Sequence, residues 1–160
     1  MLNIVITGVT NLVFTVVAMF LVDKMGRKSL LLLGSFGLTL IYLLVGGAFY
    51  FNIGGVTLLI LVVAAIACYA MTLAPIVWVV ISEIYPNRIR GVGMSLAVFA
   101  LWLGCFFLTY TFPLLNKSLD SYGTFWLYGI ICFLGALFVW RAVPETKGKT
   151  LEELEKDLVK

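Results

Sequence analysis

Long apolar runs separated by short charged clusters dominate the chain. Five runs contain no charged residue, namely residues 2–22, 29–51, 56–82, 91–115 and 121–140. Each is close to the ~20 residues that a helix needs to cross a hydrocarbon core. None alternates apolar and polar residues in the manner of a transmembrane strand. The pattern predicts an all-α membrane protein, with a five-helix membrane domain over residues 1–140 and a tail over residues 141–160.

Composition and charge support this class and predict its orientation. The chain is 62% hydrophobic and 12% charged, far from the balance of a soluble domain. Ten of the eleven Lys and Arg residues follow the first, third or fifth run, and Lys117 follows the fourth. Since these residues accumulate in cytoplasmic loops, we expect the N-terminus outside and the C-terminus in the cytoplasm. The basic residues therefore reflect topology in a lipid bilayer, and no patch among them predicts a nucleic-acid partner.

Several chemistries have little support in the sequence. The chain has no histidine, and Cys68, Cys105 and Cys132 lie within apolar runs without a Cys-x-x-Cys spacing. We expect no metal site, disulfide or other cofactor, and cysteines that serve as small packing residues. No predicted span contains an acidic residue, so paired carboxylates for acid–base catalysis are missing and an enzyme is disfavoured.

Two polar or helix-breaking features interrupt the runs. Pro75 has no N–H and crowds the carbonyl of Met71, so its helix should bend or open there and act as a hinge or as a structural kink. Thr7, Asn11 and Thr15 are spaced four apart and share one helical face. This face would either hydrogen-bond a neighbouring helix, which we favour, or line an aqueous path, with Asn11 as a candidate for substrate contact.

Two motifs carry a resemblance to a known family. The loop Asp23-x-x-Gly26-Arg27-Lys28 resembles the loop typical of the major facilitator superfamily. The residues of the second motif are Pro75, Trp78, Ser82, Glu83, Ile84, Tyr85, Pro86, Arg90 and Gly91, followed after the last run by Pro144-Glu145-Thr146-Lys147-Gly148. This order is similar to the sugar porter family, above all to its bacterial proton-coupled pentose and hexose symporters. The resemblance covers essentially the whole chain and implies the last five of twelve helices.

The resemblance implies a function and several site residues. It implies proton-coupled transport of a xylose-like or glucose-like monosaccharide by alternating access in the bacterial inner membrane, with the missing N-terminal helices on the same or a separate chain. Trp78 matches the substrate-contacting tryptophan, whereas Leu101 replaces an amide that would bond a sugar hydroxyl. The proton-carrying carboxylate would lie in the missing half. The alternatives are a truncated, non-transporting subunit that needs a partner chain, or a porter for a cyclitol or an organic acid.

The resemblance also implies a charge network at the cytoplasmic face. Its members are Asp23, Arg27, Glu83 and Arg90, which would latch one conformation. In the tail, Thr150 and Glu153 form a capping box before an amphipathic helix. Trp126 and Trp140 lie near the ends of the last run, as tryptophans of an interfacial belt do.

Overall fold

Helices make up all the regular structure of the described residues. The computed structural model describes residues 2–85, 89–143 and 145. The helices in these ranges are α1 (Leu2–Met25), α2 (Arg27–Tyr50), α3 (Val56–Met71), α4 (Leu73–Ile84), α5 (Arg90–Ser118) and α6 (Asp120–Ala142). Because α3 and α4 form one interrupted segment, five segments are long and apolar enough to cross a membrane. The predicted all-α class with five spanning helices is confirmed.

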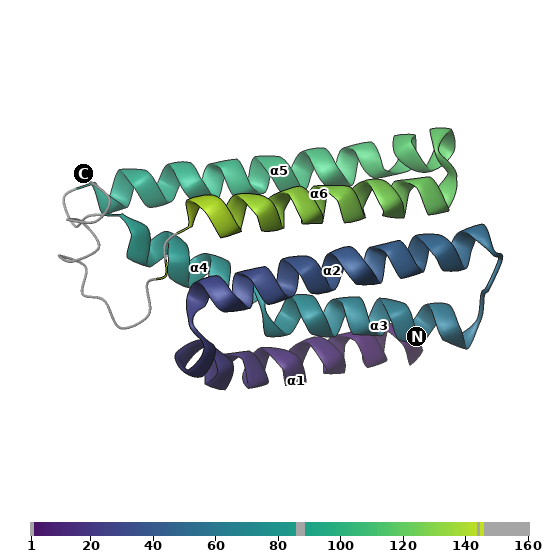
Figure 1. Ribbon diagram of the computed structural model, residues 1–160, viewed down its shortest axis with the longest axis horizontal. Helices are drawn as coiled ribbons and strands as arrows, with labels where there is room; N and C mark the ends of the chain where they lie inside the picture. Colours follow the sequence, from purple (N-terminus) through teal and green to yellow (C-terminus); the bar gives the residue numbers. More distant parts are fainter. Residues whose placement is uncertain (1, 86–88, 144, 146–160) are drawn as a thin grey trace.

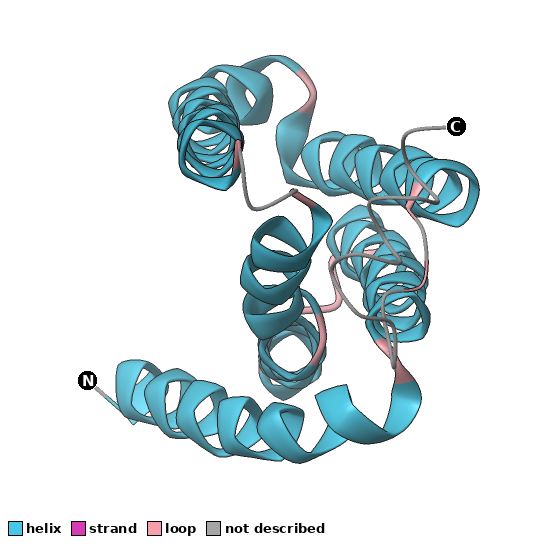
Figure 2. Cartoon of the chain, turned by 90° about the vertical axis from the view of Figure 1, so that its left-hand side faces the viewer, coloured by secondary structure: helices cyan, strands magenta, loops and turns pink. Residues whose placement is uncertain are grey.

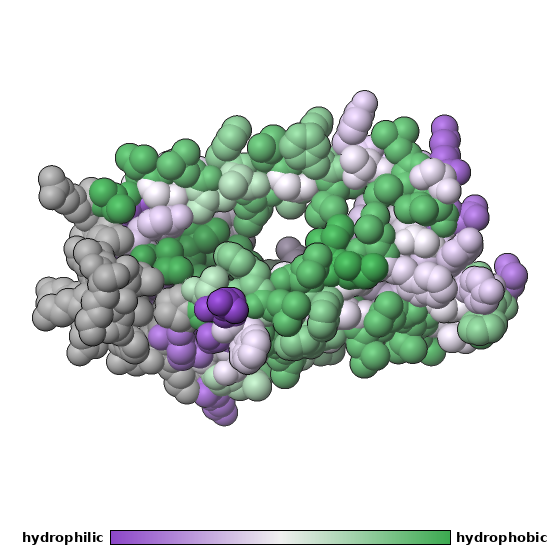
Figure 3. All heavy atoms as spheres, turned by 45° about the horizontal axis from the view of Figure 1, so that its top comes forward, coloured by the Kyte–Doolittle hydropathy of each residue, from purple (hydrophilic) through white to green (hydrophobic). Residues whose placement is uncertain are grey.

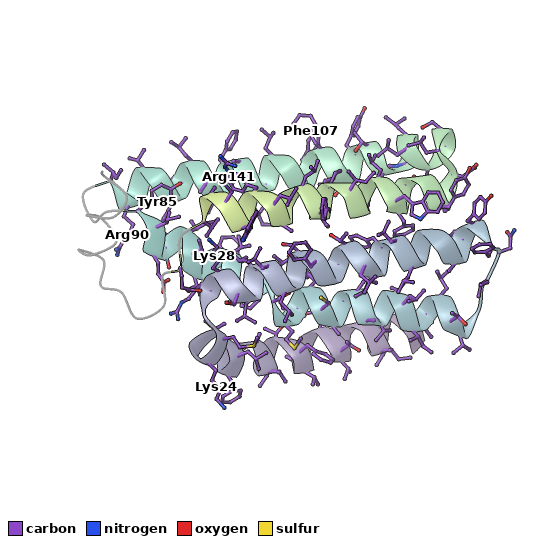
Figure 4. The ribbon with its side chains drawn as sticks, viewed as in Figure 1. Lys24, Lys28, Tyr85, Arg90, Phe107 and Arg141 are labelled. Carbon is purple, nitrogen blue, oxygen red and sulfur yellow. The ribbon has the colours of Figure 1, made fainter. Side chains whose placement is uncertain are left out.

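Short connections place successive spans antiparallel to one another. Gly26 alone separates α1 from α2 and has a φ of +88°, a conformation that glycine adopts without steric cost. Leu119 alone separates α5 from α6. Lys24, Lys28, Arg90 and Arg141 consequently lie at one end of the bundle, which we call the basic end (Figure 4). The α2–α3 and α5–α6 connections lie at the opposite end (Figure 1).

The helices pack around α2. This helix runs along α6 on one side and contacts α3 on the other, and α3 in turn packs against α1. In both ribbon views α1 and α5 lie at opposite edges of the bundle (Figures 1 and 2). The main cluster of buried apolar side chains consists of Val22, Leu30, Leu31, Ile76 and Val80. This cluster joins α1, α2 and α4 near the basic end and fixes the position of α4.

The surface of the bundle is largely apolar. Figure 3 shows hydrophobic residues over the middle of the molecule and hydrophilic residues toward its two ends. Along α5 the single buried residue is Gly93, and large side chains such as Phe99 and Trp102 are 67% and 61% exposed. Apolar exposure on this scale would be an aggregation liability in water and suits contact with lipid or with further helices. The chain is an integral membrane protein.

Candidate functional site

The polar face of α1 borders an open groove beside α3. This groove has a volume of about 640 Å³ and is lined by Ile4, Thr7, Gly8, Asn11, Leu12, Thr15 and Ile66. The three polar residues that share one helical face in the sequence are therefore together on the surface of the groove. None of their described hydrogen bonds reaches another helix. Among the described residues this face borders the groove and makes no hydrogen bond to another helix, so both the packing role that we favoured and the aqueous path stay predictions.

Asn11 is the polar residue of this groove whose side-chain N–H donors are not used by another described residue. The Thr15 hydroxyl donates to the Asn11 carbonyl oxygen at 2.8 Å and lies 3.3 Å from the side-chain oxygen of the same residue. The Thr7 hydroxyl donates to the Ile4 carbonyl at 3.0 Å. Both threonines thus satisfy their donors within α1. The Asn11 amide N–H groups have no acceptor among the described residues and face a space that a polar ligand can enter.

The span that carries Pro75 is interrupted at Thr72. This residue separates α3 from α4 with φ −121° and ψ −77°, and its hydroxyl donates to the Cys68 carbonyl at 2.6 Å. Its side chain is fully buried against α2 at Gly34, where a Cβ atom would approach the Thr72 Cβ to 2.8 Å. The break therefore lies where α2 has a glycine that leaves room for the Thr72 side chain.

The proline itself lies inside α4 and not at the break. Pro75 is the third residue of α4, among the first amides of a helix, which have no intrahelical acceptor. Its missing N–H therefore costs nothing there, and the chain opens three residues earlier. The break at Thr72 directly follows Met71, whose carbonyl the proline ring was expected to crowd, so the helix opens within the stretch that the sequence predicted.

Trp78 and Leu101 lie on other helices and do not line the α1 groove. Trp78 is on α4 with 48% of its surface exposed, so its ring is available to a ligand or to another helix. Leu101 is partly buried on α5, next to the exposed Trp102. Of the pockets described in this part of the chain, the α1 groove is lined by Asn11, and none is lined by Trp78 or Leu101.

An ion pair connects the start of α2 to the last turn of α4. Arg27 Nη2 lies 3.1 Å from Glu83 Oε1, and the side chains are 18% and 26% exposed. Two buried nitrogens of Arg90, Nε and Nη2, have no hydrogen-bond partner among the described residues. The structure thus pairs Arg27 with Glu83, whereas the side chain of Asp23 lies outside the described part of the chain.

Glu145 also contacts Arg27, and it was not among the predicted site residues. Its Oε1 accepts a hydrogen bond of 2.9 Å from the backbone N–H of Arg27, and its carboxylate lies against Gly26. A carboxylate at a helix N-terminus accepts an otherwise unpaired N–H and interacts favourably with the helix dipole. The signal was present in the sequence, because Glu145 belongs to the Pro144–Gly148 motif.

Comparison with known proteins identifies the family. The model of the "Sugar (and other) transporter" family matches residues 1–158. The chain belongs to this family. The D-xylose-proton symporter of Escherichia coli K12 is 44% identical over 97% of the chain, and the arabinose-proton symporter of Bacillus subtilis is 38% identical over 97%. These matches confirm the predicted membership in the sugar porters, which are transporters and not enzymes.

Solved structures support the same assignment. The inward-open xylose transporter of E. coli superposes with a TM-score of 0.91 at 45% identity over 97% of the chain. The chain covers 33% of the length of the E. coli symporter and 34% of the B. subtilis symporter. The five spans are therefore similar to about a third of a sugar porter.

Proposed function

We propose that this chain forms the C-terminal part of a secondary transporter that carries a monosaccharide in symport with protons across the bacterial inner membrane. The observation that carries the proposal is the 44% identity to a xylose–proton symporter over nearly the whole chain. The transporter would use alternating access, in which two bundles rock around a site near the middle of the membrane. Its partners are the sugar, the proton and the remaining helices of the transporter, on the same or a separate chain.

The described residues suit distinct roles in this process. Asn11 offers amide N–H donors to a sugar hydroxyl, and the half-exposed ring of Trp78 offers an apolar face for the sugar ring. The break at Thr72 lets α4, which carries Pro75, move relative to α3. The Arg27–Glu83 pair holds the end of α4 against α2 in one conformation, and the unpaired nitrogens of Arg90 are available to an acceptor on the remaining helices.

Proton coupling requires a carboxylate outside this chain. The acidic residues of the described spans, Glu83 and Asp120, lie at the ends of their segments, far from the middle of a bilayer. A proton carrier for sugar symport therefore belongs to the remaining helices.

A chimeric transporter tests the proposal. The corresponding third of the E. coli D-xylose-proton symporter is replaced by this chain, and uptake of labelled xylose is measured in cells that lack other xylose transport. We expect saturable, proton-dependent uptake.

The variant Asn11→Ala should raise KM roughly tenfold because one hydrogen bond to the sugar is lost, and Trp78→Ala should abolish uptake. The control Trp140→Phe changes an exposed aromatic residue outside the groove and should transport normally.

Two outcomes would contradict the proposal. A folded chimera that transports no sugar would favour the non-transporting subunit, and normal uptake by Asn11→Ala and Trp78→Ala would remove their assigned roles. The chain expressed alone should give no uptake, since it represents about a third of a transporter.

Leu101 favours a second candidate substrate class. An apolar residue where the resemblance to the sugar porters implies an amide removes one hydrogen bond to a sugar hydroxyl, so a cyclitol with a different arrangement of hydroxyls or an organic acid is the second candidate. Competition of labelled xylose uptake by glucose, inositol and small organic acids distinguishes the candidates. Stronger competition by inositol or by an acid than by glucose would replace the monosaccharide assignment.

A further inference from the structure

A second pocket lies at the end of the bundle opposite the basic end. It occupies about 390 Å³ between the last turn of α2 and the first turn of α6 and is lined by Phe49, Tyr50, Asn52, Asp120, Ser121 and Tyr122. Both spans terminate here, because the α2 span ends at Tyr50 and the α6 span begins at Asp120. The pocket is therefore at the level of the lipid headgroups, and it shares no lining residue with the α1 groove.

Aromatic rings form one wall of this pocket. The ring centroids of Tyr50 and Tyr122 are 5.6 Å apart in an edge-to-face arrangement, and the Trp126 ring lies 5.6 Å from Tyr122. Trp126 is anchored in turn by the hydrogen bond that its Nε1 donates to the Leu43 carbonyl at 3.3 Å. Aromatic rings held in this way present faces and edges of fixed direction, and the faces attract cations.

Hydrogen-bond acceptors form the other wall. Asp120 begins α6 at φ +56°, is exposed, and its carboxylate has no ion-pair partner among the described residues. The Ser121 hydroxyl donates to Asn116 Oδ1 at 2.9 Å, so that its own lone pairs remain available. Asn52 adds an amide oxygen. A carboxylate, a hydroxyl oxygen and an amide oxygen beside aromatic rings complement a cation that carries several N–H donors.

We propose that this pocket binds the primary ammonium group of a phospholipid headgroup, as in phosphatidylethanolamine. A primary ammonium offers three N–H donors to the acceptors around Asp120, whereas a quaternary ammonium offers none. A lipid is favoured over a free amine because the pocket is at the ends of two spans that expose large apolar side chains. Leu44 on α2 is 51% exposed and Ile130 on α6 is 54% exposed, and acyl chains can cover both.

Lipid titration by native mass spectrometry tests this site. The purified chain in detergent is titrated with phosphatidylethanolamine, phosphatidylcholine and phosphatidylglycerol of the same acyl chains. We expect the ethanolamine lipid to bind most tightly. The variant Asp120→Asn should bind it about fivefold more weakly, because a charge is lost at an exposed aromatic site. Asparagine tolerates a positive φ, so this variant should keep the fold and the thermal unfolding temperature.

Matched variants distinguish specific binding in the pocket from nonspecific binding of lipids elsewhere on the chain. Arg141→Gln removes a charge at the other end of α6 and should leave the ratio of ethanolamine-lipid to glycerol-lipid affinity unchanged. Tyr50→Leu removes a ring of the pocket and should lower that ratio. The proposal is overturned if Asp120→Asn keeps the wild-type ratio, or if phosphatidylcholine or phosphatidylglycerol binds the wild-type chain as tightly as phosphatidylethanolamine does.

Discussion

Trp126 shows how a single side chain can combine two roles. Its position near a span end is that of an interfacial tryptophan, and the sequence supports this interpretation. In the structure its indole lies directly on Gly46 of α2, where a Cβ atom would come within 2.5 Å of Nε1 and 3.0 Å of the Tyr122 carbonyl oxygen. The ring therefore also fixes the distance between α2 and α6. A sequence alone does not show which glycine a tryptophan will face, because that depends on the register of two helices distant in the chain.

Substitution of Gly46 tests this contact. Gly46→Ala forces the indole or α6 to move, and we expect it to lower the unfolding free energy by about 1–3 kcal/mol, as overpacked sites do. Its neighbour Gly47 has no atom within 4 Å of its ideal Cβ position. Gly47→Ala is the matched control and should be neutral or stabilising by up to ~1 kcal/mol, the difference in helix propensity between the two residues.

Thermal unfolding in detergent measures both glycine variants. For a chain of this size, 1 kcal/mol corresponds to a shift of roughly 2–4 °C in Tm. Equal shifts for Gly46→Ala and Gly47→Ala would show that the contact between Gly46 and the indole carries no stability.

The division of one span into α3 and α4 is the main feature at the scale of elements. A proline in an apolar run predicted a discontinuity, and the structure contains one three residues before the proline. The exact place depends on the space that Gly34 leaves for Thr72, which belongs to a different helix. The proline therefore located the interruption to within one helical turn, and we expect the contact between Thr72 and Gly34 to select the residue.

Gly34→Ala tests the control of the break by α2. The added Cβ would overlap the Thr72 side chain and approach the Leu73 Cγ to 3.0 Å. We expect a loss of stability of about 1–3 kcal/mol. The double variant Gly34→Ala/Thr72→Gly, which removes the overlapping side chain, should lose less than the sum of the two single variants. Additive losses in thermal unfolding would indicate that the two residues do not act through one contact.

The charged residues at the basic end also show that a sequence can identify site residues without showing how they pair. The motifs identified Arg27 and Glu83, and the structure places them in one ion pair. Glu145 joins them through the backbone N–H of Arg27, a contact across 118 residues that no local pattern predicts. Motif residues are readily recognised from a sequence, whereas their pairing depends on which distant segments the fold brings together.

At the scale of the whole molecule, the fold was easier to predict than the site. Uncharged runs of suitable length determine five spans because each must satisfy its backbone hydrogen bonds within the membrane. The groove beside Asn11 depends on the distance between α1 and α3, while the half-exposed Trp78 and the partly buried Leu101 lie on other helices. In a chain that spans about a third of its relatives, these residues would complete a site only with further helices.

The orientation of the molecule in the membrane is a prediction that follows from the different numbers of basic residues at its two ends. Lys24, Lys28, Arg90 and Arg141 gather at the basic end (Figure 4), while Asn52, in the α2–α3 connection, and Lys117, in the last turn of α5, lie at the opposite end. Since translocation disfavours clustered Lys and Arg, the basic end should be cytoplasmic and the N-terminus outside.

Cysteine labelling decides this orientation. In a background with Cys68, Cys105 and Cys132 replaced by serine, an impermeant maleimide applied to intact cells should label Asn52→Cys and Lys117→Cys. Lys24→Cys is exposed on the same molecule and should react only after the cells are opened. Labelling of Lys24→Cys in intact cells would reverse the orientation and would place the Arg27–Glu83 pair on the outer face. The latch proposed for that pair would then control the outer opening of the transporter, so this measurement also fixes which side of the cycle the ion pair controls.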